Sequence, residues 1–134
     1  MKTHGYEEIE HTADLAIRAW GQDFHTLLTQ AADGLYYLMG LELENSKELT
    51  QVFEIQGESQ EILLVDFLNE ILYHAEKNRV FSKFSFDQTN DSLVITAYGY
   101  QAGGFKHEIK AATFHNLSID YKGKVLEATI TFDV

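Results

Sequence analysis

The stretch DFHTLLTQAADGLYYLMG, which runs from Asp23 to Gly40, predicts an amphipathic helix. Its apolar residues recur every three or four positions, so they share one face of a helix. Asp23 is suited to cap the amino end of this helix, and Gly40 is suited to end it. Gly34 lies inside the helix, where glycine costs about 1 kcal/mol relative to alanine, so we expect close packing at that point.

A second amphipathic helix is predicted in SQEILLVDFLNEILYHAEKN, residues 59–78. Ser59 can cap it, and Glu61 lies near its positive end. Its apolar face consists of Leu64, Phe67, Leu68, Ile71, Leu72 and Ala75. We expect its polar face to meet water or to dock on a basic protein. That face carries Asp66, Asn69, Glu70 and Lys77.

The remaining segments alternate between apolar and polar residues as strands do. Two pairs of them resemble hairpins, with turns at Asn90-Asp91 and at Lys122-Gly123. The segment QAGGFKH, residues 101–107, is predicted to be a loop. The predicted strands are Tyr6–Glu10, Leu15–Trp20, Leu49–Gln56, Val80–Phe86, Ser92–Tyr100, Thr113–Tyr121 and Lys124–Asp133.

This order of elements predicts an α+β fold, in which two helices pack on a mostly antiparallel sheet as a two-layer sandwich. The length of 134 residues suits one domain that spans residues 1–134. The order of the strands within the sheet is left open by the pattern.

Charge is the most informative property of the composition. Twenty-one acidic residues against ten lysines and arginines give a net charge of −11. Such a chain repels nucleic acid backbones and anionic membranes, so we expect a cation or a basic protein as its partner instead.

The chain has no cysteine, which excludes disulfides and cysteine-based zinc sites. It also has no long apolar run and no signal-peptide core, so we expect a soluble cytoplasmic protein.

The familiar catalytic motifs are absent from the sequence. The six histidines form no HExxH pair, and no nucleophile elbow or phosphate-binding loop is present. His25 falls in the first turn of the first helix and His74 on the polar edge of the second, so we expect both at the surface. The sequence therefore predicts no catalytic centre.

Two aspartates far apart in the sequence suggest a different kind of site. Asp14 ends the motif HTAD, residues 11–14, and Asp133 precedes the last residue, Val134. If the last strand lay beside Leu15–Trp20, both aspartates and the terminal carboxylate would crowd together. Carboxylates that close need a cation between them, and oxygen ligands suit calcium, magnesium or manganese. The plainer alternative, which the residues alone favour, is that Asp14 caps a turn and Asp133 is a solvated end.

Five segments, taken in order along the chain, resemble one known family. The combination is similar to the archeases, small acidic proteins that assist the RtcB-type tRNA-splicing ligase. The segments are EHTADLAIRAWG (10–21), LLTQAADGLYYLM (27–39), LLVDFLNEILYHAE (63–76), IKAATFHNLSI (109–119) and ATITFDV (128–134).

The resemblance implies a divalent metal site. Asp14, Asp133 and Val134 occupy the positions that bind the metal ion in archeases, with calcium expected first and magnesium or manganese as the alternatives. His11 lies in the same motif, where it would support a metal ligand or contact a partner. The resemblance therefore favours the carboxylate site over the plainer alternative.

The resemblance also implies a function. An archease is not an enzyme; it speeds guanylylation of the ligase histidine and allows the ligase to turn over repeatedly, in tRNA splicing or RNA repair. Lys110 and His115 match family positions that would contact the ligase or maintain local structure. Two other functions stay open. One is a chaperone-like or acidic docking module, and the other is a metal-dependent hydrolase that uses Asp14, Asp133 and a histidine.

Overall fold

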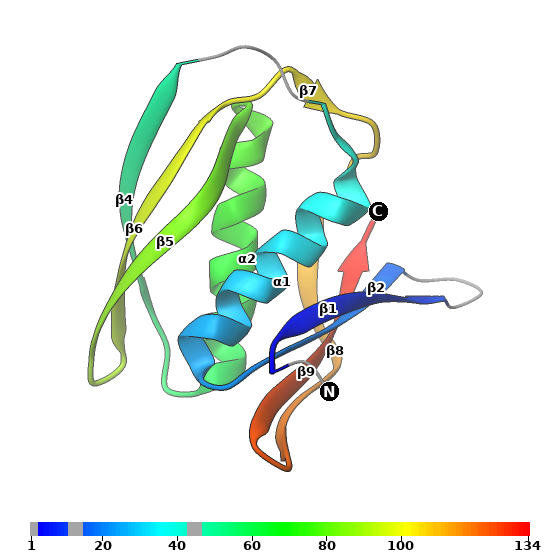
Figure 1. Cartoon of the computed structure of the whole chain (residues 1–134), viewed down its shortest axis with the longest axis vertical. Coiled ribbons are helices and arrows are strands. Elements are labelled where there is room, and N and C mark those ends of the chain that lie inside the picture. Colours follow the sequence, from blue (N-terminus) through cyan, green and yellow to red (C-terminus); the bar gives the residue numbers. More distant parts are fainter. Residues whose placement is uncertain (1–2, 11–14, 43–46) are drawn as a thin grey trace.

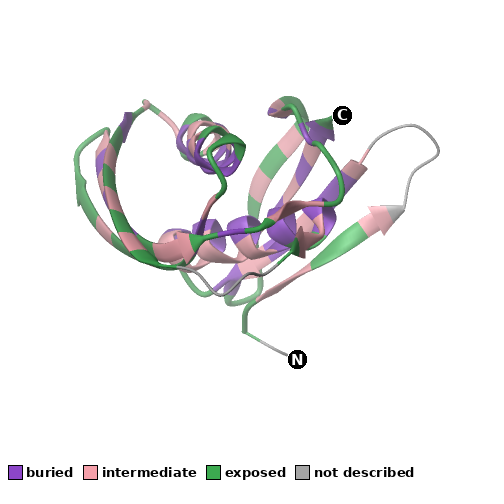
Figure 2. Ribbon diagram, turned by 90° about the horizontal axis from the view of Figure 1, so that it is seen from above, coloured by how far each residue is buried: buried purple, intermediate pink, exposed green. Residues whose placement is uncertain are grey.

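Two helices lie between two antiparallel sheets in the computed structural model, which describes residues 3–10, 15–42 and 47–134 (Figure 1). The helices are α1 (Phe24–Met39) and α2 (Gln60–Glu76). Seen from above, α2 is viewed end-on between the sheets (Figure 2). The prediction of an α+β fold with two helices and mostly antiparallel strands is confirmed.

The strands form two main sheets rather than the single sheet that we expected. The larger sheet has the order β1-β2-β9-β8 and the smaller one β4-β6-β5, while β3 and β7 pair separately. Every pairing among the described strands is antiparallel. The bounds are β1 Gly5–Glu10, β2 Leu15–Gly21, β3 Leu41–Glu42, β4 Glu48–Gln56, β5 Arg79–Thr89, β6 Ser92–Gln101, β7 Gly104–Phe105, β8 Ala111–Lys122 and β9 Val125–Asp133.

The division into two sheets follows from how the helices are buried. Helix α1 contacts β1, β2 and β9 of the larger sheet, and it also contacts α2 and β5. Helix α2 contacts β8 of the larger sheet together with β4 and β5 of the smaller one. A helix that meets elements on more than one side needs a wider apolar surface than a single stripe. Helix α2 therefore lies between the two sheets, whereas α1 lies between the larger sheet and α2 and also contacts β5.

The predicted helix ends are confirmed. The Asp23 side chain accepts a hydrogen bond from the backbone N–H of Thr26 at 2.8 Å, and the Ser59 hydroxyl accepts one from Ile62 at 3.2 Å. Gly40 ends α1 in the left-handed region, with φ of 66°. No helix within the described residues is long and apolar enough to cross a membrane.

The two predicted hairpins are also confirmed, β5-β6 at Asn90-Asp91 and β8-β9 at Gly123. The prediction that residues 101–107 form a loop is partly wrong, because Gly104–Phe105 forms β7 and pairs with β3. That pairing depends on a segment remote in sequence, which local patterns do not reveal. The strand β8 is longer than predicted and begins at Ala111.

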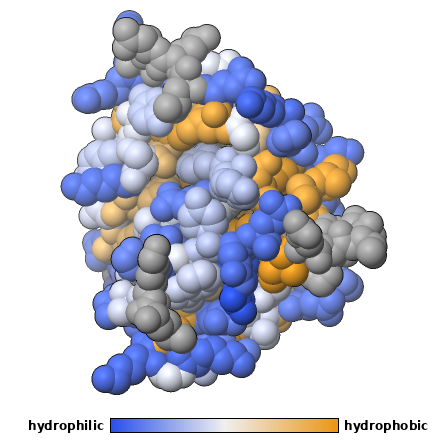
Figure 3. Space-filling model, turned by 45° about the vertical axis from the view of Figure 1, so that its right-hand side comes forward, coloured by the Kyte–Doolittle hydropathy of each residue, from blue (hydrophilic) through white to orange (hydrophobic). Residues whose placement is uncertain are grey.

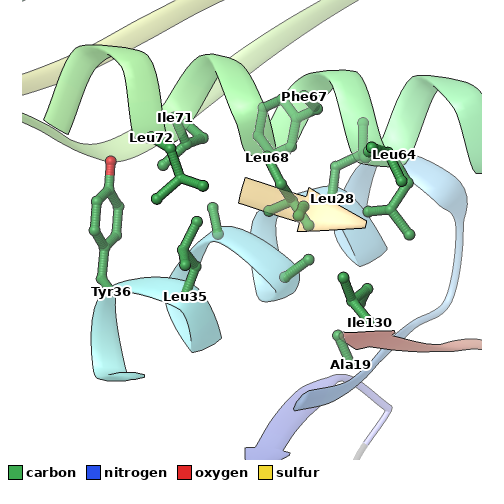
Figure 4. Close-up of a cluster of buried hydrophobic side chains, with 14 of the residues drawn as sticks. Ala19, Leu28, Leu35, Tyr36, Leu64, Phe67, Leu68, Ile71, Leu72 and Ile130 are labelled. Carbon is green, nitrogen blue, oxygen red and sulfur yellow. The ribbon is translucent and has the colours of Figure 1, made fainter. Parts of the chain in front are cut away.

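The core lies where the two helices face each other and the larger sheet. Leucine side chains of α1 and α2 meet there, together with Ala19 from β2 and Ile130 from β9 (Figure 4). Full burial of one such leucine or isoleucine contributes about 1.5–3 kcal/mol. The fully buried members from these four elements include Ala19, Leu28, Leu35, Leu64, Leu68, Ile71 and Ile130.

Gly99 provides a test of the packing between β5 and β6. It pairs with Phe81 where the register of β5 shifts, and a Cβ atom at Gly99 would collide with the carbonyl oxygen of Val80. We expect Gly99→Ala to lower the free energy of unfolding by at least about 2 kcal/mol, because backbone has to move to relieve the clash. Thr96→Ala, on the same strand, adds no atom and should cost less than about 1 kcal/mol. Urea unfolding of both variants measures the difference, and equal losses would contradict the close approach.

Candidate functional site

The pairing of β2 with β9 determines what lies near the end of the chain. The antiparallel ladder runs from Leu15 opposite Phe132 to Gly21 opposite Leu126. The beginning of β2 therefore lies beside the end of β9, which is the pairing that the carboxylate-site hypothesis requires. Asp133, directly after Phe132, is exposed at this end of the sheet.

The structure also brings Lys110 to Asp133. Ala111 pairs with Asp133 across β8 and β9, and the backbone N–H of Lys110 donates to the carbonyl oxygen of Asp133 at 2.8 Å. Lys110 and Asp133 are both exposed, and Val134 is 60% exposed. One end of the larger sheet thus presents a lysine and a carboxylate from hydrogen-bonded backbone positions.

Two of the predicted site residues, His11 and Asp14, lie outside the described residues. Among the residues that the structure describes, no group of three or more histidine, cysteine, aspartate or glutamate side chains is arranged to hold a metal ion. Asp133, which Val134 follows, carries a carboxylate, the type of oxygen donor that calcium, magnesium and manganese prefer. The metal site stays a prediction, and it requires Asp14 in addition to Asp133 and Val134.

His115 lies in a bulge of β8. The register of β8 against β9 shifts after Thr113, so that residues 114–117 bulge from the ladder. The hydroxyl of Thr113 donates to the carbonyl oxygen of Thr131 at 3.1 Å and accepts the N–H of His115 at 3.3 Å. Phe114 is 56% exposed, and His115 is exposed beside it. The bulge therefore presents an aromatic ring and an imidazole at the surface.

A surface depression of about 780 Å³ adjoins the last residue of the chain. Figure 3 brings this side of the molecule forward and shows apolar surface interrupted by hydrophilic side chains. The depression places apolar surface next to charged groups of both signs, close to Val134. Its lining includes Glu8, Leu15, Tyr37, Leu38, Gly40, Lys106, His107, Glu108 and Val134.

The prediction that Asn69 faces water is wrong. Its half-buried side chain forms two hydrogen bonds with Ala112 of β8: Oδ1 accepts the backbone N–H at 2.8 Å, and Nδ2 donates to the carbonyl oxygen at 3.4 Å. Helix α2 thereby covers part of the edge of β8, an edge strand of the larger sheet. The sequence contained a reason to expect this contact, because asparagine is a poor residue for a helix interior unless a tertiary contact compensates.

The prediction that His74 lies at the surface is also wrong, since this residue is only 6% exposed. Its ring lies 5.2–5.4 Å from the rings of Phe53, Tyr73 and Phe81, measured between centroids. Phe53 and Phe81 belong to β4 and β5, so the smaller sheet covers the side of α2 that the helical pattern alone marks as polar.

Arg79 determines the tautomer of the neutral His74 ring. Nη1 of Arg79 lies 3.2 Å from Nδ1 of His74, and because a guanidinium group only donates, Nδ1 has to accept. The neutral ring then carries its proton on Nε2, which lies 3.8 Å from a carboxylate oxygen of Glu70. Burial, followed by the charges of Arg79 and Lys77, lowers the pKa of His74.

The fold and this site define a small acidic α+β protein whose last strand lies in the middle of the larger sheet and ends in an exposed aspartate beside a lysine. The family model described as "Archease protein family (MTH1598/TM1083)" matches residues 6–134. The chain belongs to this family, and the resemblance predicted from sequence is confirmed.

Individual relatives match over nearly the whole chain. A protein archease from Sulfurisphaera tokodaii is 32% identical over 137 residues, which cover 96% of this chain and 98% of that protein. The solution structure of Methanobacterium thermoautotrophicum protein 1598 has a TM-score of 0.75 with 25% identity, and the match covers 97% of this chain and 99% of that one. The crystal structure of an archease from Thermotoga maritima, described as a possible chaperone, has a TM-score of 0.69 with 27% identity and covers 96% of each chain.

His74 should make the protein less stable in mild acid. Its pKa in the folded protein is lowered from the ordinary value of 6.5, so below that pH the unfolded chain binds the proton more readily than the folded protein does. Its contribution to stability is therefore complete above about pH 6.5 and is lost as the pH falls toward the folded pKa. We expect the free energy of unfolding to decrease between about pH 7.5 and about pH 5.5, and to decrease less in His74→Gln, which does not titrate there. Urea unfolding at both pH values checks this; an equal decrease in the variant would assign the effect to other groups.

Proposed function

We propose that this protein is a non-catalytic activator of an RtcB-type RNA ligase, which promotes guanylylation of the ligase and its multiple turnover in tRNA splicing or RNA repair. Membership of the archease family over residues 6–134 supports this proposal. The observation that carries it is the pairing of Leu15 with Phe132, because it brings the strand that follows the HTAD motif beside the last residues of the chain.

Charge supports a protein partner rather than direct binding of RNA. A net charge of −11 repels a phosphate backbone but is attracted to the basic surface that an RNA-binding enzyme needs. The activator would then act by touching the ligase, and the ligase would hold the RNA. Neither nucleic acid nor a membrane is a partner in this proposal.

The proposed metal site consists of Asp14, Asp133 and the terminal carboxylate of Val134. Leu15 and Phe132 are paired, and Asp14 and Asp133 are each one peptide bond away from them in the sequence. A divalent ion, calcium first and magnesium or manganese as alternatives, would offset the mutual repulsion of these carboxylates. His11, from the same motif, would support a metal ligand or contact the ligase.

Lys110 and His115 are the proposed ligase contacts on the neighbouring strand. Lys110 is exposed and its backbone is hydrogen-bonded to Asp133, so it belongs to the same end of the sheet as the carboxylates. His115 is exposed in the bulge of β8, next to the exposed ring of Phe114. A partner that covered this end of the sheet could meet a cation, carboxylates and an aromatic ring together.

A chaperone-like role is the second candidate. The Thermotoga maritima relative is described as a possible chaperone, and several large hydrophobic side chains of this protein are exposed, among them Val52, Tyr73 and Tyr121. A chaperone would protect unrelated unfolded proteins from aggregation, whereas the proposed activator acts on one ligase. An aggregation assay with an unrelated client separates the two roles.

The decisive assay is multiple-turnover RNA joining by the cognate RtcB-type ligase, with GTP and manganese, in the presence and absence of this protein. The chain needs an untagged carboxyl terminus, because Val134 belongs to the proposed site. We expect the protein to increase turnover, and Asp14→Ala and Asp133→Ala each to reduce that increase at least about tenfold.

Asp120→Ala is the matched control, because Asp120 is an exposed aspartate on β8 that pairs with Glu127, well along the strand from Asp133. This variant should activate as well as the wild type does. Full activation by Asp14→Ala and Asp133→Ala would remove the metal site from the mechanism. An absence of activation by the wild type would overturn the activator role, and RNA cleavage by the protein alone would favour the hydrolase.

A further inference from the structure

One side chain of α2 binds the strand that adjoins the proposed site. The amide of Asn69 is hydrogen-bonded to both backbone groups of Ala112, at 2.8 Å to the N–H and 3.4 Å to the carbonyl oxygen. A side-chain amide that binds the N–H and the C=O of one residue satisfies the same groups that a neighbouring strand would satisfy. Asn69 therefore takes the place of a neighbouring strand along this part of the edge of β8.

Ala112 is adjacent to the positions that carry the site. It pairs with Phe132, and Ala111, the residue before it, pairs with Asp133. Lys110, one residue further, donates its backbone N–H to the carbonyl oxygen of Asp133 at 2.8 Å. The hydrogen bonds thus run without a gap from the helix to β8, and from β8 to the end of β9.

The first residues of β8 need such an anchor. Their regular pairing with β9 extends only from Ala111 to Thr113, because the bulge at residues 114–117 interrupts the ladder. Ile109 and Ala112 are buried at this end, which opposes a slip of the strand, but few side chains contribute. A two-point hydrogen bond fixes the position of the strand, because a shift by one residue would break it.

We propose that Asn69 is a positioning residue for the carboxylate site: it holds Ala111–Thr113 in register and thereby places Lys110 and Asp133. The consequence for metal binding rests on the proposed function, whereas the effect on the strand does not. Asn69 itself touches neither the proposed metal ion nor the ligase in this scheme; it acts through the backbone of β8.

The test compares Asn69→Leu with Tyr36→Phe in the full chain with its native carboxyl terminus. Asn69→Leu keeps a similar volume and removes both hydrogen bonds to Ala112. Tyr36→Phe also removes a hydrogen bond to a strand, the one from the N–H of Phe81 to the Tyr36 hydroxyl at 3.0 Å, but it does so at the smaller sheet. The two variants should therefore lose a similar free energy of unfolding, but only Asn69→Leu should loosen the beginning of β8.

Two measurements test the role of Asn69. Amide hydrogen exchange of Lys110 should be at least about tenfold faster in Asn69→Leu than in Tyr36→Phe, because only the first variant frees the beginning of β8. Calcium titration should show binding about 10–100-fold weaker in Asn69→Leu and unchanged in Tyr36→Phe. Asn69→Asp keeps the acceptor for the N–H of Ala112 and loses the donor, so its exchange rate should be intermediate.

Exchange of Lys110 at the rate of the Tyr36→Phe control would overturn the role of Asn69. Faster exchange with unchanged calcium affinity would overturn its role in the carboxylate site. A wild-type protein that binds no calcium would contradict the metal part of the proposed function, and the exchange of Lys110 would still decide whether Asn69 positions the strand.

Discussion

The pairing of β2 with β9 is the constraint on which the rest of the molecule depends. It joins residues 15–21 to residues 126–132 in the middle of the larger sheet, where Ile17 and Ile130 lie opposite each other and are fully buried. Closing so long a loop costs conformational entropy, and the burial of both strands beneath α1 offsets that cost. Without this pairing, the β1-β2 pair and the β8-β9 hairpin would not join into one sheet.

The same pairing brings together the parts of the proposed site. Because β2 begins where β9 ends, the region that follows the HTAD motif and Asp133 meet at one end of the sheet, and β8 adds Lys110 there. A surface of this kind suits contact with another protein: it is exposed, it combines a lysine with carboxylates, and it adjoins both apolar surface and a bulge with an exposed aromatic ring. Its chemistry agrees with a protein that acts through a partner.

Helix α2 connects this end to the remainder of the fold through polar side chains. Asn69, in the middle of the helix, binds the edge of β8, and His74, near its carboxyl end, is enclosed by rings, so that burial, together with the charge of Arg79, lowers its pKa. In each case a polar group leaves water and finds a partner on a different element, as a buried polar group must. These contacts set the direction in which α2 lies relative to each sheet, which apolar packing alone leaves loosely specified.

The sequence by itself determined the local elements: both helices with their caps at Asp23 and Ser59, the two hairpins, the α+β class and the family. The site residues that it indicated, Asp133 and Lys110 among them, stay predictions, and Asp14 and His11 lie outside the described residues. Only the tertiary structure decided the strand order, the division into two sheets, the burial of His74 and the contact between Asn69 and Ala112. The physical reason is the separation along the sequence between the residues that determine each feature. Caps and turns depend on residues a few positions apart, whereas strand order and the partners of polar side chains depend on segments that only the folded chain brings together.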